Sequence, residues 1–297
     1  MNTVNAKIWQ QKQKERRKIL RENRNDKIVG RSHKRIYSVI LLAALSLPLI
    51  ALGGYFYRQH AGYSALEVSA NIINVKAGGN LQAALERATP GDTIKLEAGA
   101  SFVGNFNLPL KTGGEFITIR TSAADEKLAP AGARIELAKS VAFLPKISSP
   151  NADATITAVN GAHHYRFVGV EFGATRGGVG NIIQLGTTDE RRIEDLPHHI
   201  EFDRVFIHGS PTEGQRRGIA ANGKFIKIIN SYISDIKRKG DESQAIGVWA
   251  TDGPVEIVNN YLEAAAENIL FGGAESYLQL TPTDCLVSGN HLNKPLK

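Results

Sequence analysis

Five segments of the chain share one eight-residue pattern: YRFVGVEF (165–172), IEFDRVFI (200–207), IKIINSYI (226–233), VEIVNNYL (255–262) and CLVSGNHL (285–292). The first and third residues of each are apolar, and this alternation predicts a half-buried strand. The third positions are Phe167, Phe202, Ile228, Ile257 and Val287, so the pattern recurs after 35, 26, 29 and 30 residues. A strand that recurs at such intervals, without a helical period between the copies, predicts a β-solenoid.

A second set of short apolar runs lies between these segments, at residues 182–185, 219–221, 245–249 and 269–271. Glycine, Asn-Gly or Asp-Gly follows each run and supplies the positive φ of a tight turn. Two or three strands per turn predict the coil of a parallel β-helix. An antiparallel sandwich with regular strand spacing is the alternative.

Stacked coils align equivalent residues, which allows three predictions. The first positions of the pattern form an inward apolar ladder, namely Tyr165, Ile200, Ile226, Val255 and Cys285. Side chains at one bend hydrogen-bond along the axis, namely Ser231, Asn260 and Asn290. Rings stack at another position, namely Phe206, Tyr232, Tyr261 and His291.

A short amphipathic helix is expected before the repeats. Residues 81–88 carry apolar side chains at helical spacing, and Pro90-Gly91-Asp92 ends the helix and turns the chain. The first coil of a solenoid needs a cover, because an open end exposes apolar side chains and unpaired strand edges. This helix is the predicted cap.

The string GGNLQAALERATPGDTIKL (78–96) resembles the amino-terminal cap of the pectin-lyase-like right-handed β-helix superfamily, which includes pectate, alginate and chondroitin lyases. A later block, containing residues 241–246, 259–263 and 267–273, resembles a bacterial group of uncharacterised β-helix proteins. The resemblance covers residues 72–297 and implies an all-β, right-handed parallel β-helix. It implies little about activity, because one fold hosts many functions.

Residues 36–57, IYSVILLAALSLPLIALGGYFY, form an uncharged run of 22 residues. As a helix this run spans about 30 Å, the thickness of a bilayer core, and aromatic residues lie at both of its ends. A cleaved signal peptide is the alternative, but the 35-residue leader and the length of the run favour an uncleaved single-pass anchor.

The charge distribution predicts the orientation of this anchor. Residues 1–35 contain 12 Lys or Arg and three acids, a net +9, whereas the whole chain is +7 and the remainder therefore −2. The positive-inside rule places this basic leader in the cytoplasm. The β-helix, after a linker at 58–71, then lies on the periplasmic or extracellular side of a bacterial inner membrane. The membrane orientation already accounts for the basic tract, so no nucleic-acid partner is expected.

Two features concern the end of the chain. Cys285 is the only cysteine, which excludes an intrachain disulfide and a thiolate metal site, and its ladder position predicts a buried apolar side chain.

The chain stops at Lys297, five residues after Leu292, without a covering segment. A solenoid needs such a cover, so we expect the domain at 72–297 to be incomplete at its carboxyl terminus.

The resemblance implies a possible chemistry. Lyases of this fold neutralise a uronate carboxyl group with Ca²⁺ or basic side chains, and a Lys, Arg, His or Tyr removes the adjacent proton. The best local match is the loop 237–242, KRKGDE. Lys239 or Arg238 is the candidate base, and Arg217 or its neighbour Arg216 the candidate carboxylate contact. Asp241 and Glu242 are candidate Ca²⁺ ligands. A solvated charged turn is the alternative.

Other catalytic patterns are missing from the sequence. The ordered acid, His and Arg-x-Lys motifs of polygalacturonases and the Trp-x-Asp-His signature of pectate lyases do not occur. The pairs His163-His164 and His198-His199 each begin a pattern strand. Adjacent residues on a strand face opposite sides, so neither pair is expected to form a metal site.

Two hypotheses of function follow. One is a membrane-tethered enzyme, a lyase acting on acidic polysaccharide. The other is a noncatalytic β-helix that binds glycan or organises the cell envelope. An enzyme should bring basic and acidic side chains together in one groove, whereas a binding protein should present an aromatic or polar strip.

Overall fold

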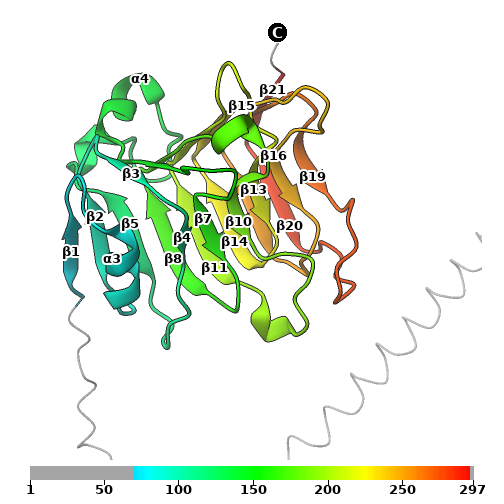
Figure 1. The fold of residues 1–297 in the computed structure, drawn as a ribbon, viewed down its shortest axis with the longest axis horizontal. Coiled ribbons are helices and arrows are strands. Elements are labelled where there is room, and N and C mark those ends of the chain that lie inside the picture. Colours follow the sequence, from blue (N-terminus) through cyan, green and yellow to red (C-terminus); the bar gives the residue numbers. More distant parts are fainter. Residues whose placement is uncertain (1–69, 295–297) are drawn as a thin grey trace, which may run out of the picture. The chain divides into compact units, whose positions relative to one another are not determined.

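Three parallel β-sheets run along residues 70–294, the part of the chain that the computed structural model describes (Figure 1). The eight-stranded sheet contains, in spatial order, β1 (Ile72–Val75), β2 (Thr93–Leu96), β5 (Ile117–Thr121), β8 (His163–Val168), β11 (His198–Asp203), β14 (Lys224–Ile229), β17 (Val255–Val258) and β20 (Cys285–Ser288). The seven-stranded sheet contains β3 (Ser101–Val103), β6 (Lys146–Ser148), β9 (Glu171–Phe172), β12 (Phe206–His208), β15 (Tyr232–Ile236), β18 (Tyr261–Ala264) and β21 (His291–Asn293). The six-stranded sheet contains β4 (Phe106–Asn107), β7 (Ile156–Ala158), β10 (Asn181–Leu185), β13 (Arg217–Ala221), β16 (Gln244–Val248) and β19 (Glu267–Phe271).

The chain visits the three sheets in turn, so that each circuit is one coil. β11, β12 and β13 form one coil, and β14, β15 and β16 form the next. Every named strand of residues 70–294 pairs in parallel with its counterpart in the neighbouring coil, for example β11 with β14 and β13 with β16. The predicted parallel β-helix is confirmed, and the antiparallel sandwich is wrong for these residues.

The inward ladder has the predicted register. Tyr165 lies opposite Ile200, which lies opposite Ile226, and the series continues through Val255 to Cys285. The rings of Phe167 and Phe202, two residues along, stack with centroids 5.2 Å apart. Burial ends at the last coil. Cys285 is only partly buried, contrary to the prediction, because β20 has no further strand on its outer side within the described residues.

Side chains at one bend hydrogen-bond from coil to coil, as predicted. Asn260 Oδ1 accepts from the backbone nitrogen of Ser231 at 2.9 Å, and Asn290 Oδ1 accepts from that of Asn260 at 2.8 Å. Each amide also donates inward, Asn260 to the carbonyl of Ile228 and Asn290 to that of Ile257. We call Ser231, Asn260 and Asn290 the amide ladder.

The predicted ring stack also forms, on the outer face of the seven-stranded sheet. Tyr232 and Tyr261 lie nearly parallel with centroids 4.1 Å apart, and His291 follows at 5.1 Å from Tyr261. Phe206 meets Tyr232 edge-on at 5.9 Å. Phe206 and Tyr232 pack against a small satellite core. Part of this core comes from the segment with the short helices η1 (Asp125–Lys127), α4 (Leu137–Ser140) and η2 (Val141–Phe143).

The predicted cap is α3 (Leu81–Arg87), which contacts β1 and β4 at one end of the coils (Figure 1). Asn80 begins the helix by accepting a hydrogen bond from the backbone nitrogen of Ala83. After the helix, the buried carboxylate of Asp92 accepts bonds from the backbone nitrogens of Thr89 and Asn71. Burial opposes its ionisation, but these hydrogen bonds more than offset that effect and hold the pKa of Asp92 below its usual range.

The two histidine pairs differ from the prediction. His164 and His199 adopt left-handed backbone conformations, with φ of 58° and 52°. This departure from extended geometry cancels the alternation of side chains along the strand. The Nδ1 atoms of His163 and His164 are consequently 2.7 Å apart, as are those of His198 and His199. The statement that adjacent histidines face opposite sides is therefore wrong here.

The predicted leader, anchor and most of the linker precede residue 70 and lie outside the described residues. Within residues 70–294, no helix has the length and apolar character needed to cross a bilayer.

Candidate functional site

Four polar side chains lie in register across the six-stranded sheet. Asn181, Arg217, Gln244 and Glu267 occupy the first positions of β10, β13, β16 and β19 and pair in that order. Arg217 donates from Nη1 to Asn181 Oδ1 at 2.8 Å and from Nε to Gln244 Oε1 at 2.9 Å. Gln244 in turn donates to Glu267 Oε2 at 3.0 Å. We call these four residues the Arg217 row.

An aromatic ring lies against this row. The Arg217 guanidinium is 4.6 Å from the centre of the Trp249 ring, a cation–π contact. A Cβ atom at Gly247 would lie 2.5 Å from the Trp249 ring and 3.1 Å from Arg217 Nε. Only glycine therefore lets the two side chains meet over β16.

The turn that carries Trp249 is fixed by a buried amide one coil earlier. Asn222 Oδ1 accepts from the backbone nitrogens of Trp249 and Ala250, each at 3.0 Å. Asn222 is itself fully buried. The ring is thus held by the protein core rather than by a free loop, which suits a preformed binding surface.

The charge of Arg217 is partly balanced by neighbouring acids. Burial, together with the positive charge of Arg216, lowers the pKa of Arg217 to about 10, although Glu242 and Glu267 oppose the shift. The guanidinium is therefore charged at neutral pH. Its Nε and Nη1 atoms have acceptors, whereas Nη2 has none among residues 70–294.

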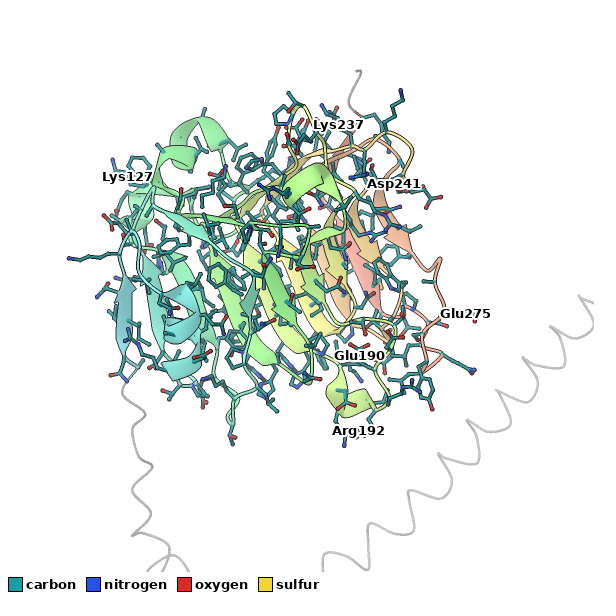
Figure 2. All side chains as sticks on the ribbon, viewed as in Figure 1. Lys127, Glu190, Arg192, Lys237, Asp241 and Glu275 are labelled. Carbon is teal, nitrogen blue, oxygen red and sulfur yellow. The ribbon has the colours of Figure 1, made fainter. Side chains whose placement is uncertain are left out.

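The structure brings together only part of the predicted site. Figure 2 shows Lys237 and Asp241 at the upper edge of the ribbon, and Glu190 and Arg192 at the lower edge, with the six-stranded sheet between them. Two predicted residues meet here: Arg217 is part of the row, and Glu242 reaches it, with its Oε2 3.5 Å from Gln244 Nε2.

The remaining residues of the loop 237–242 face away from the row or pair with one another. Asp241 Oδ2 lies 2.6 Å from Arg238 Nε, an ion pair whose angle does not meet hydrogen-bond geometry. Lys239 is exposed and forms no ion pair within the described part of the chain. Arg216, the neighbour of Arg217, is also exposed.

Asp241 and Glu242 do not fit a Ca²⁺ site. Arg238 already pairs with Asp241, and Glu242 is turned toward the Gln244 amide. Ca²⁺ takes six to eight oxygen ligands, far more than these two side chains supply. No step of a reaction is therefore derived through this ion.

Lys239 lines a pocket of about 630 Å³ together with Lys237 and Arg238 of the same loop. Pro211, Thr212 and Glu213 also line this pocket. Three basic side chains and one carboxylate therefore line it.

A second basic surface lies on the outer face of the eight-stranded sheet, in a pocket of about 520 Å³. Its arginines are neutralised: Arg166 lies 2.6 Å from Glu201, Arg204 lies 2.6 Å from Asp203, and Arg120 pairs with Asp125. Lys95 has no such partner among residues 70–294. The pocket therefore offers little free positive charge to an anionic ligand.

One buried charge cluster was not predicted. Glu171 Oε1 lies 2.8 Å from Lys146 Nζ and 3.0 Å from His208 Nε2 on the seven-stranded sheet. Burial opposes ionisation, but the hydrogen bonds from His208 and Lys146 hold the pKa of Glu171 below its usual range. Lys146 precedes the repeats in sequence, so no repeat position links it to the other two residues. The cluster satisfies its own charges, which indicates a structural role.

Comparison with known proteins gives two similar solved structures. No protein-family model and no curated protein matches the chain. The structure of an alginate lyase from Paenibacillus sp. str. FPU-7 has 16% sequence identity and a TM-score of 0.37, over 75% of this chain and 74% of that one. Pectate lyase Pel9A has 15% identity and a TM-score of 0.31, over 76% of this chain and 63% of its own length. The three parallel sheets of residues 70–294 establish a parallel β-helix, the architecture expected from the cap sequence.

Proposed function

We propose that this protein binds an acidic polysaccharide at the Arg217 row, as a membrane-tethered β-helix on the extracytoplasmic side. One observation carries the proposal. The Arg217 guanidinium is fixed by Asn181, Gln244 and Trp249, yet its Nη2 has no acceptor among the described residues. A fixed, charged donor with an unused N–H group is suited to a carboxylate.

The surroundings of Arg217 suit a sugar ligand. The two side-chain amides and the one carboxylate of the row supply both donors and acceptors for hydroxyl groups. Trp249 adds a half-buried ring, whose apolar face complements the C–H groups of a pyranose. A polar strip with an aromatic side chain is the arrangement expected of a binding surface, and Lys239 and Asp241 do not converge on it.

The tether and the location come from the sequence. The uncharged run at 36–57 has the length of a membrane helix, and the net charge of +9 before it favours a cytoplasmic amino terminus. The β-helix then faces the periplasm or the cell exterior, where acidic polysaccharides occur.

Binding is tested with the full-length protein in detergent, by calorimetry against pectate, alginate and chondroitin, with dextran as the uncharged control. We expect Arg217→Ala to weaken binding by about tenfold or more, since a hydrogen bond to a charged group contributes about 1.5–3 kcal/mol. Lys95→Ala, which removes a cation from the other basic surface, should leave binding unchanged. Equal affinity of the Arg217→Ala variant and the wild type for every anionic chain would refute the proposal.

A lyase is the second candidate, and the pocket beside Lys239 is the observation that favours it. An unpaired amine there is a possible base for β-elimination. Incubation with the same three polysaccharides should then give unsaturated products, measured by ultraviolet absorbance, and Lys239→Ala should abolish them. A protein that binds these chains but yields no product with any of them is a binding protein.

A further inference from the structure

Four histidines from two neighbouring coils form one cluster at the start of β8 and β11. His163 and His198 lie opposite each other in register, and their rings stack with centroids 4.5 Å apart. His164 and His199 stack in the same way, also at 4.5 Å. Within each pair the two Nδ1 atoms are 2.7 Å apart. Ring nitrogens of His163, His164 and His198 all lie within 4.8 Å of one another.

A left-handed residue at the same position of three successive coils brings these rings together. The left-handed conformation of His164 and His199 turns each ring to the side on which its neighbour lies. Such a conformation is uncommon for a residue other than glycine. The next coil has Phe225 at the same position, also left-handed, and its ring stacks on His199 at 4.4 Å. Phe116 meets His164 edge-on from the other side at 5.3 Å.

Burial of the four rings favours the neutral form of imidazole. Burial lowers the pKa of all four, and that of His198 to about 4, with the other histidines adding to the effect on His198. The neighbouring acids Glu115 and Glu201 act in the opposite direction, on His164 and His199 respectively. Neutral imidazole is the form that ligates transition metals.

We propose that His163, His164 and His198 bind a divalent transition-metal ion, with His199 holding the ring of His198 in place. Three imidazoles without a carboxylate suit zinc, copper, nickel or cobalt rather than calcium or magnesium. Two nitrogens bound to one such ion at about 2.1 Å are at most about 4.2 Å apart. The ring nitrogens of the cluster all lie within 4.8 Å of one another, so any pair farther apart than about 4.2 Å moves together on binding.

The site is independent of polysaccharide binding. The histidines begin strands of the eight-stranded sheet, whereas the Arg217 row lies on the six-stranded sheet. The ion would join two successive coils, in addition to the backbone ladder between β8 and β11. It would therefore stabilise the folded state by mass action.

The experiment uses the full-length protein in detergent and Co²⁺ as the probe, because nitrogen-bound Co²⁺ absorbs visible light. We expect the absorption to saturate at one equivalent and to be abolished by competing Zn²⁺. His164→Asn is the main test variant, because asparagine tolerates a left-handed backbone and removes the imidazole. Its affinity for Co²⁺ should fall by about tenfold or more.

Two controls and a second variant make the result decisive. His291→Asn changes an exposed histidine on β21, and His33→Asn/His60→Asn removes the histidines that precede the β-helix; both should keep wild-type affinity. His198→Gln repeats the test at an extended position if His164→Asn fails to melt cooperatively. The proposal is overturned if the wild type shows no saturable absorption, if folded His164→Asn or His198→Gln binds Co²⁺ as the wild type does, or if either control loses binding.

Discussion

Asn260 Oδ1 lies 2.9 Å from the backbone nitrogen of Ser231, which occupies the equivalent position one coil earlier. The same side chain donates to the carbonyl of Ile228 at 2.8 Å. One buried amide thus satisfies a donor and an acceptor of the preceding coil at a bend, where the strand ladder is interrupted. The amide ladder continues the hydrogen bonding of the sheets around the corner.

Replacing Asn260 with Ala should destabilise the β-helix by about 1–3 kcal/mol, because the buried N–H of Ser231 loses its acceptor. Chemical denaturation followed by circular dichroism measures the change. Asn74→Ala, at an exposed position of β1, is the matched control and should have little effect. Equal stability of the two variants would show that water satisfies the backbone N–H of Ser231 when the Asn260 side chain is removed.

Gly247→Ala should separate Arg217 from Trp249, since the added methyl group would lie 2.5 Å from the ring. In a Trp9→Phe background Trp249 is the only tryptophan, so its fluorescence should shift to the red and polysaccharide affinity should fall. Overpacking of this kind costs about 1–3 kcal/mol of stability. Gly114→Ala adds the same methyl group where no atom lies within 4 Å and should change neither quantity. An unshifted spectrum in Gly247→Ala would contradict the assigned contact.

Glu171 should make stability depend on acid pH. Its folded-state pKa is held below the ordinary value of 4.5, so its ion pairs stabilise the fold above about pH 4.5 and are lost as the pH falls through the lower, folded-state pKa. The melting temperature of Glu171→Gln should therefore lie well below that of the wild type at pH 7 and approach it as the pH falls below 4.5 and through the folded-state pKa. Glu256→Gln, in an exposed pair with Lys227 at 3.2 Å, should show little difference at either pH. A constant gap for Glu171→Gln across this range would rule out the ion-pair account.

Protease added outside intact inner-membrane vesicles of the native orientation should digest only the part after residue 57. The physical reason is that a basic, cytoplasmic leader is protected by the bilayer. Permeabilised membranes, in which the leader also becomes accessible, provide the control. Detection of a mature amino terminus within residues 54–65 would instead demonstrate a cleaved signal peptide.

The repeated pattern was enough to predict the coil, the inward ladder and the amide ladder, and the helical spacing of residues 81–88 predicted the cap. Each of these depends on residues whose spacing is set by the local geometry of strand and bend. Phe167 and Phe202 occupy the same place in their segments, so parallel stacking brings them together whatever the lengths of the connecting loops. The predictions failed where an end effect intervened, as at Cys285, which has a coil on one side only within residues 70–294.

The contacts between side chains on the outer surface were decided by the tertiary structure. Arg217 meets Trp249 only because Gly247 is on the strand between them and Asn222 fixes the turn, and no spacing rule connects these residues. Lys239 and Asp241 belong to the same loop as Glu242 but do not reach the row, since a loop has no period that assigns its side chains to a face. The histidine cluster shows the same limit. Side chains alternate between the two faces of a strand only where the backbone is extended, and the left-handed backbone of His164 and His199 ends this alternation.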